Sequence, residues 1–163
     1  MSINFSADEI FEMAEQIERN GAKFYCRAAK GSFEEDYRQK LLELAKMEIE
    51  HEKTFAAMRT QLSGKETGTT VFDPYGELAL YLQAMADGYV FDLNADPSEN
   101  LAGKSVEEIL KTAIGLEKDS IVFYLGIKDM VPERFGRDKI DKIIREEMGH
   151  VTLLSDGLAA LSR

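Results

Sequence analysis

The sequence lacks what would build a disulfide framework, a thiolate metal site or a membrane span. Cys26 is the single cysteine among 163 residues, which excludes both an internal disulfide and a Cys-x-x-Cys metal knuckle. No apolar run approaches the length of a transmembrane helix, and the first residues have neither the basic nor the hydrophobic region of a signal peptide. We therefore expect a soluble chain in the reducing cytoplasm.

Positive charge is also scarce. The chain has 30 Asp and Glu against 20 Lys and Arg, and its net charge of -10 repels phosphate backbones and anionic lipids. We therefore expect neither nucleic-acid binding nor membrane binding. The length of 163 residues matches one domain, residues 1–163, that can bury an ordinary core.

Helical patterns fill most of the chain. Ser6 with Glu9 and Ser105 with Glu108 form capping boxes, the arrangement that begins helices. The apolar periodicity predicts helices over residues 6–30, 33–62, 73–91, 105–130 and 132–161, with loops at 65–73 and 94–104.

The two halves of the chain repeat each other. An offset of 99 residues aligns residues 6–62 with residues 105–161 without a gap. The offset relates Ser6 to Ser105, Glu18 to Glu117, Tyr25 to Tyr124, Glu48 to Glu147 and His51 to His150. Packing alone would preserve apolar periodicity but has no reason to keep glutamate, tyrosine and histidine in one register. We therefore predict an internal duplication.

Both histidines of the chain follow a glutamate by three residues, in the pairs Glu48 and His51 and Glu147 and His150. Residues three apart lie one turn apart on the same face of a helix. Each pair can therefore direct a carboxylate oxygen and an imidazole nitrogen at one point, which offers two ligands to a metal ion.

Glu18 and Glu117 join these pairs because all six residues fall on the heptad seams of four predicted helices. The seams alternate spacings of three and four residues, the pattern of helices packed in a bundle. We therefore predict an all-α four-helix bundle with the six residues facing its core. Glu50 and Glu146 flank the pairs but fall off the seams, so we predict both at the surface.

Four clustered carboxylates in a core would repel one another, and each would lose its hydration. No lysine or arginine falls on the seams to neutralise them. Two divalent metal ions would do so, because four positive charges balance four carboxylates. Oxygen and imidazole ligands without thiolate suit iron or manganese, and zinc can occupy the same site. The predicted metal ligands are Glu18, Glu48, His51, Glu117, Glu147 and His150.

These residues resemble the ligand set of the ferritin-like di-iron carboxylate proteins, and within them the rubrerythrin family, over nearly the whole chain. The resemblance implies a ferritin-like antiparallel bundle with a long crossover that contains the additional short helix. It also implies a di-iron centre in which Glu48 and Glu147 bridge the ions. Tyr25 and Tyr124 match tyrosines that hydrogen-bond ligating carboxylates, although simple filling of core space is an equal alternative.

Two features depart from the family pattern. Rubrerythrins proper carry a rubredoxin domain with Cys-x-x-Cys knuckles, which this chain lacks, so the resemblance implies a separate electron donor, rubredoxin-like or a flavoprotein. Peroxidase-type members place an additional glutamate where this chain has Ser120. Bundles of this family commonly pair, so a homodimer is expected.

Three functions fit this pattern. The favoured hypothesis is a di-iron oxidoreductase of oxidative-stress defence, in which Fe(II) reacts with peroxide or O2 in a peroxidase or ferroxidase reaction. The second is a metal-binding or iron-handling protein that uses the same ligands without catalysis. The third is a helical interaction module whose polar core fixes the register of the helices.

Overall fold

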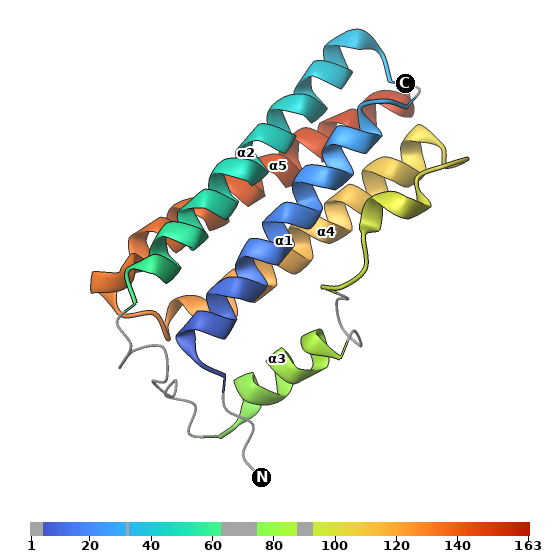
Figure 1. Cartoon of the computed structure of the whole chain (residues 1–163). Helices are drawn as coiled ribbons and strands as arrows, with labels where there is room; N and C mark the ends of the chain where they lie inside the picture. The colour runs from blue at the N-terminus through green and yellow to red at the C-terminus, as the bar shows by residue number, and fades with distance from the viewer. Residues whose placement is uncertain (1–4, 32, 63–74, 88–92) are drawn as a thin grey trace.

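Four long helices run side by side in the structure, a computed structural model that describes residues 5–31, 33–62, 75–87 and 93–163 (Figure 1). The four are α1 (Ala7–Ala28), α2 (Glu35–Thr60), α4 (Val106–Lys128) and α5 (Arg137–Leu161). The described residues contain no β-strand, so the prediction of an all-α bundle is confirmed. None of their helices combines the length and the hydropathy needed to cross a membrane.

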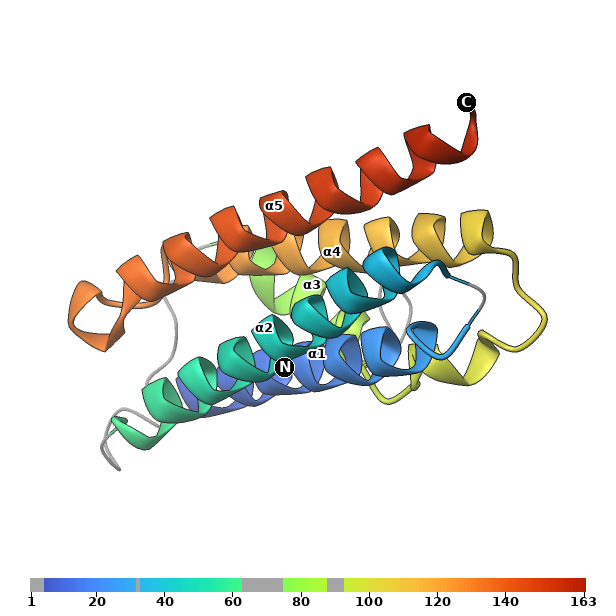
Figure 2. The ribbon, with the colours of Figure 1, turned by 90° about the horizontal axis from the view of Figure 1, so that it is seen from above.

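The helices pair into two hairpins, α1 with α2 and α4 with α5, which Figure 2 shows as the two sides of the bundle. The crossover between them contains the short helix α3 (Glu77–Ala86) and a 3-10 turn (Pro97–Asn100). Asn20, buried on α1, holds the end of this crossover. Its Nδ2 donates hydrogen bonds to the carbonyl oxygens of Leu93 at 3.2 Å and Ala95 at 3.3 Å.

The predicted capping boxes begin the two helices at equivalent places in the hairpins. The Ser6 hydroxyl accepts a hydrogen bond from the backbone N–H of Glu9, whose carboxylate accepts one from the backbone N–H of Ser6 at 2.8 Å. Ser105 and Glu108 do the same at the start of α4. Each box satisfies backbone donors that the first turn of a helix leaves unpaired.

Three predicted helix starts differ from the structure. α2 begins at Glu35 rather than at residue 33, because Glu34 is extended with ψ of 153°. α5 begins at Arg137 rather than at residue 132, because Gly136 has a φ of 97°, which breaks a right-handed helix. α3 begins at Glu77, after Gly76 with a φ of 70°. The rest of the predicted helix 73–91 lies largely outside the described residues.

Two apolar clusters fill the bundle above and below a polar middle layer. One cluster contains Phe11, Phe55, Phe123 and Ile143, and the other contains Phe24, Leu41, Leu110 and Leu154. Both draw on all four long helices. The clusters close the middle layer off from water along the bundle axis, so polar groups placed there interact at a low effective dielectric.

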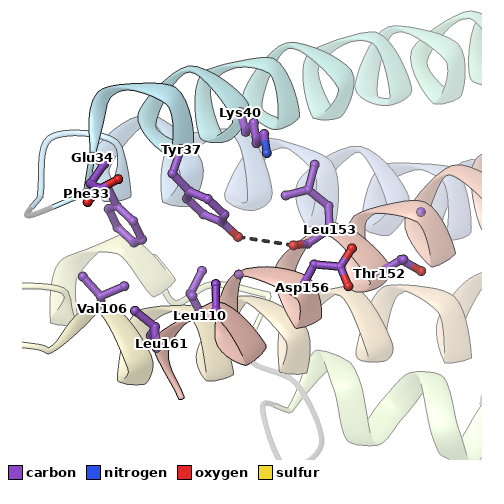
Figure 3. Close-up of a pocket in the computed structure, with 13 residues that line it drawn as sticks. Phe33, Glu34, Tyr37, Lys40, Val106, Leu110, Thr152, Leu153, Asp156 and Leu161 are labelled. Atoms are coloured by element: carbon purple, nitrogen blue, oxygen red, sulfur yellow. Dashed lines mark hydrogen bonds between the residues drawn. The ribbon is translucent and has the colours of Figure 1, made fainter. Parts of the chain in front are cut away.

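The glycines of α5 have opposite surroundings. At Gly157, an added Cβ would lie 2.7 Å from Cζ and 2.8 Å from Cε2 of Tyr37, whose hydroxyl donates a hydrogen bond to the carbonyl oxygen of Leu153 at 3.4 Å (Figure 3). Tyr37 also stacks on Phe33, with 5.5 Å between ring centroids. At Gly149, an added Cβ would meet nothing within 4 Å. Of these two glycines of α5, Gly157 is needed for close packing and Gly149 is not.

We expect Gly157→Ala to lower the free energy of unfolding by about 1–3 kcal/mol, because the Tyr37 ring must leave its place. Gly149→Ala is the matched control, and it should raise the free energy of unfolding by up to about 1 kcal/mol through helix propensity alone. Urea unfolding of the metal-free chain, followed by circular dichroism, measures both. Equal effects of the two substitutions would contradict the packing role of Gly157.

Candidate metal centre

Six ionisable side chains from the four long helices meet in the middle layer. α1 and α4 each supply one glutamate, whereas α2 and α5 each supply a glutamate and a histidine. Each of the six is at most 4% exposed: Glu18, Glu48, His51, Glu117, Glu147 and His150. The structure thus brings together every predicted metal ligand, and their binding of metal stays a prediction.

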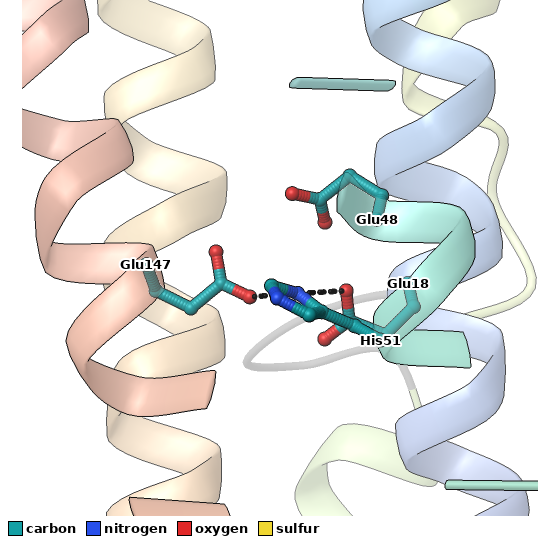
Figure 4. Close-up of side chains that lie close together, drawn as sticks. All are labelled: Glu18, Glu48, His51 and Glu147. Atoms are coloured by element: carbon teal, nitrogen blue, oxygen red, sulfur yellow. Dashed lines mark hydrogen bonds and ion pairs between the residues drawn. The ribbon is translucent and has the colours of Figure 1, made fainter. Parts of the chain in front are cut away.

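The six residues form two groups of four that can each surround a metal ion. The first group is Glu18, Glu48, His51 and Glu147, and the second is Glu48, Glu117, Glu147 and His150. Within each group, one ligand atom of every residue lies within 4.8 Å of the others. Figure 4 shows the first group, whose side chains point toward a common centre from three helices. Glu48 and Glu147 belong to both groups, as carboxylates that bridge two ions must.

Both histidines direct Nδ1 at the carboxylates. His51 Nδ1 lies 3.0 Å from Glu147 Oε1 and 3.3 Å from Glu18 Oε2. His150 Nδ1 lies 2.9 Å from Glu147 Oε2 and 3.1 Å from Glu48 Oε1. The carboxylate of Glu147 therefore lies between the two imidazole rings, which are 5.9 Å apart and nearly parallel.

Two tyrosines bind the outer glutamates across the hairpins. The Tyr25 hydroxyl, on α1, donates a hydrogen bond to Glu117 Oε1 on α4. The Tyr124 hydroxyl, on α4, donates one to Glu18 Oε1 on α1. Burial first, and then the glutamate charges, raise the pKa of each phenol well above its ordinary value. Both therefore stay protonated donors that hold their glutamates in place.

The close carboxylates change one another's protonation in the metal-free chain. Burial, reinforced by the charge of Glu147, raises the pKa of Glu48 well above its ordinary value and that of Glu117 to about 8. Glu147 itself behaves differently. Burial and the charge of Glu18 would raise its pKa, but the close imidazoles of His150 and His51 outweigh those effects and lower it.

The two histidines carry positive charge in the metal-free chain. Burial alone would lower the pKa of each, but the close glutamate carboxylates raise the pKa of His51 to about 11 and that of His150 to about 10. Protons on the histidines and on part of the carboxyl groups therefore offset the buried negative charge when no metal is bound.

Protein partners alone do not satisfy the donor atoms. Both oxygens of Glu147, Oε1 of Glu48 and both ring nitrogens of His150 are buried without a well-directed hydrogen bond, despite separations near 3 Å. Ligand atoms that converge without hydrogen-bonding to one another suit a shared cation once the protons leave. Two divalent ions fit both the charge and the donor set of carboxylates and imidazoles.

Gly21 makes room for one shared carboxylate. A Cβ at this position would lie 2.7 Å from Glu48 Oε2. Its counterpart at the 99-residue offset is Ser120, whose hydroxyl donates a hydrogen bond to the carbonyl oxygen of Leu116 at 3.0 Å. The two halves thus surround the site with different small residues.

Glu146 is a site residue that the sequence did not reveal. We predicted it at the surface, but its side chain is only 30% exposed, and its Oε2 lies 3.0 Å from His51 Nε2. A carboxylate on the outer nitrogen of a ligating histidine fixes the orientation of the ring. Glu50 is exposed as predicted and pairs with Lys53 at 2.6 Å. The two cases differ in their partners: Glu146 reaches from α5 to a histidine of α2, whereas Glu50 pairs with a lysine of its own helix.

Comparison with known proteins agrees with the fold and with this cluster. No protein-family model matches the sequence, and no curated protein matches it. Among solved structures, the chain is similar to a Thermotoga maritima protein described as ferritin-like and diiron-carboxylate. The TM-score is 0.76 at 25% identity, over 98% of each chain. The predicted ferritin-like fold is confirmed, and membership of the rubrerythrin family within it stays a prediction.

The shared glutamates should matter to both ions. We expect Glu48→Gln, which keeps the side-chain size and removes the charge, to lower bound Fe(II) from two ions per chain to less than one. Glu18→Gln should leave one ion, because the second group of four stays complete. Metal analysis after anaerobic loading measures the difference. Glu50→Gln is the matched control and should keep both ions; equal losses in the first two variants would refute the bridging role.

Metal binding should strengthen as pH rises. Because the pKa of Glu117 is raised to about 8, its protonation stabilises the metal-free fold fully below about pH 4.5, and this contribution is lost as pH rises through 8. The metal-free chain should therefore lose stability over this range, whereas a bound ion needs the deprotonated ligands. We expect Mn(II) to raise the unfolding temperature more at about pH 8 than at about pH 6. An equal rise in unfolding temperature at both pH values would contradict proton release from these ligands.

Proposed function

We propose that this chain is a di-iron oxidoreductase of rubrerythrin type, which uses two Fe(II) ions to reduce peroxide or O2. The observation that carries the proposal is the pair of ligand groups that share Glu48 and Glu147. The Thermotoga maritima protein, described as diiron-carboxylate, supports iron as the metal. One ion would be held with Glu18 and His51, and the other with Glu117 and His150.

A bound pair of Fe(II) ions supplies the two electrons that convert one peroxide and two protons into two water molecules. Around that chemistry, the protein residues have distinct tasks. Tyr124 and Tyr25 fix one oxygen each of Glu18 and Glu117, which leaves the other oxygen of Glu18 directed at His51. The apolar clusters on both sides exclude bulk water from the site.

The space beside the ligands supports a small substrate. A cavity of about 10 Å³ lies between α1 and α4, and Glu48, Glu117, Gly21 and Ser120 line it. Such a volume holds about one water-sized molecule. It is too small for an organic substrate.

Anaerobic loading with Fe(II), followed by peroxide, tests the proposal. We expect the absorption band of an oxidised iron pair to form, with one peroxide consumed for every two Fe(II) ions. Peroxide consumption should become catalytic when dithionite is supplied as reductant. Stopped-flow absorbance and a peroxide assay measure both steps.

Glu147→Gln should slow this oxidation at least about tenfold, since even outer partners of metal ligands have effects of that size. Glu50→Gln, an exposed change of the same kind on α2, should leave it unaltered. Stable binding of two Fe(II) ions without oxidation by peroxide or O2 would refute the oxidoreductase. It would favour the metal-handling alternative instead.

A further inference from the structure

A surface cavity of about 620 Å³ lies over the metal centre, between α2 and α5. Lys46 and Lys53 line it from α2, and Lys139 and Lys142 line it from α5. We call it the lysine cavity. All four lysines are exposed.

The lysine cavity is positive on a strongly acidic chain. Four lysines and two glutamates line it, a net charge of +2, whereas the whole chain carries -10. Lys53 pairs with Glu50 at 2.6 Å, and Lys142 with Glu146 at 3.6 Å. Lys46 and Lys139 have no ion-pair partner in the described part of the chain. Positive potential at such a cavity attracts anionic groups.

One residue that lines the lysine cavity is a predicted metal ligand. His51 and Glu146, joined at 3.0 Å, both line it. From the cavity, the His51 ring leads directly to Glu18 and Glu147. Two other cavities lack this feature. The larger one, about 800 Å³ and shown in Figure 3, and a basic one of about 350 Å³ around Lys23 and Lys30 contain no predicted ligand.

The small reactants of the proposed function do not explain the lysines. Peroxide and O2 are neutral, and Fe(II) is repelled by positive charge. The remaining requirement is electrons: after each peroxide, two Fe(III) ions must each gain one electron to return to Fe(II). Cys26 is the single cysteine, so no dithiol within the chain can supply them.

We propose that the lysine cavity is the docking surface of a small acidic electron-transfer protein, which passes electrons to the metal centre through the edge of His51. The inference rests on the proposed oxidoreductase function. Two reduced donor molecules lose one electron each, and two Fe(III) ions gain one each. The positive charge of the lysine cavity is complementary to an acidic partner. In a two-fold dimer of this chain the same cavity would face its own copy, lysine against lysine, so charge favours a separate partner.

The expected complex is short-lived. Exposed ion pairs add little to affinity, so lysines at the rim speed the encounter more than they hold the partner. Such steering is screened by salt. The interaction should therefore appear mainly in the association rate at low ionic strength.

The test compares two charge reversals of equal size. Lys46→Glu with Lys139→Glu changes the two unpaired lysines of the lysine cavity. Lys23→Glu with Lys30→Glu changes the basic cavity that lacks a predicted ligand, and serves as the control. Metal content and circular dichroism are checked first, so that only folded, iron-loaded variants are compared.

Reduction of the peroxide-oxidised protein by a reduced acidic rubredoxin is then followed by stopped flow at low salt. We expect the second-order rate constant to fall about tenfold or more in the first variant and to change less than about twofold in the control. High salt should remove the difference. Equal losses in both variants, or none in the first, would overturn the proposal.

Fe(II)–EDTA, a small anionic reductant, separates a protein partner from a small anion. If the first variant were reduced more slowly by Fe(II)–EDTA but equally fast by rubredoxin, the lysine cavity would be an entrance for small anions. That result would overturn the docking surface. Failure of the proposed function looks different, because the unaltered protein would then never be oxidised by peroxide. If peroxide oxidises the protein but rubredoxin reduces both variants at the same rate, only the docking surface is refuted.

Discussion

The structure depends on how a bundle core can hold four carboxylates side by side. Glu18 and Glu147 are fully buried, and Glu48 and Glu117 nearly so. Each loses its hydration and repels the others, so positive charge must be present in every stable state. Protons on the histidines and on part of the carboxyl groups supply it in the metal-free chain. Two divalent ions would supply it at higher pH, where those protons leave.

The same carboxylates join the two hairpins. Tyr25 reaches from α1 to Glu117 on α4, and Tyr124 reaches from α4 to Glu18 on α1. The rings also pack in the apolar clusters, with Phe24 and Phe123 as edge-on neighbours. Filling core space and holding a glutamate are therefore not alternatives here, because one side chain does both. Neither hairpin contains a complete group of four ligands, so the site forms only when the hairpins meet.

The sequence predicted the six clustered side chains better than it predicted the residues around them and the starts of the helices. A heptad seam states which side chains face the core, and this alone brought six residues from four helices to one layer. It does not state how far apart two helices lie, so Glu146 was missed although its long side chain reaches His51. Helix starts failed where one backbone torsion decides them, as at Gly136. The role of Asn20 depends on the path of the crossover, which periodicity does not describe.

Departures from the 99-residue repeat make the two sides of the candidate metal centre different. At the 99-residue offset, Glu146 corresponds to Met47. Within the described part of the chain, His51 has a carboxylate on its outer nitrogen and His150 does not. Lys53 and Lys142 likewise correspond to Thr152 and Glu43, which makes one end of the α2–α5 groove more basic than the other. The six predicted ligands and the two tyrosines keep the repeat, whereas Glu146, Lys53 and Lys142, which break it, line the cavity on one side of His51. The ligand symmetry thus suits a matched pair of ions, while the asymmetry outside it favours one side for the approach of a partner.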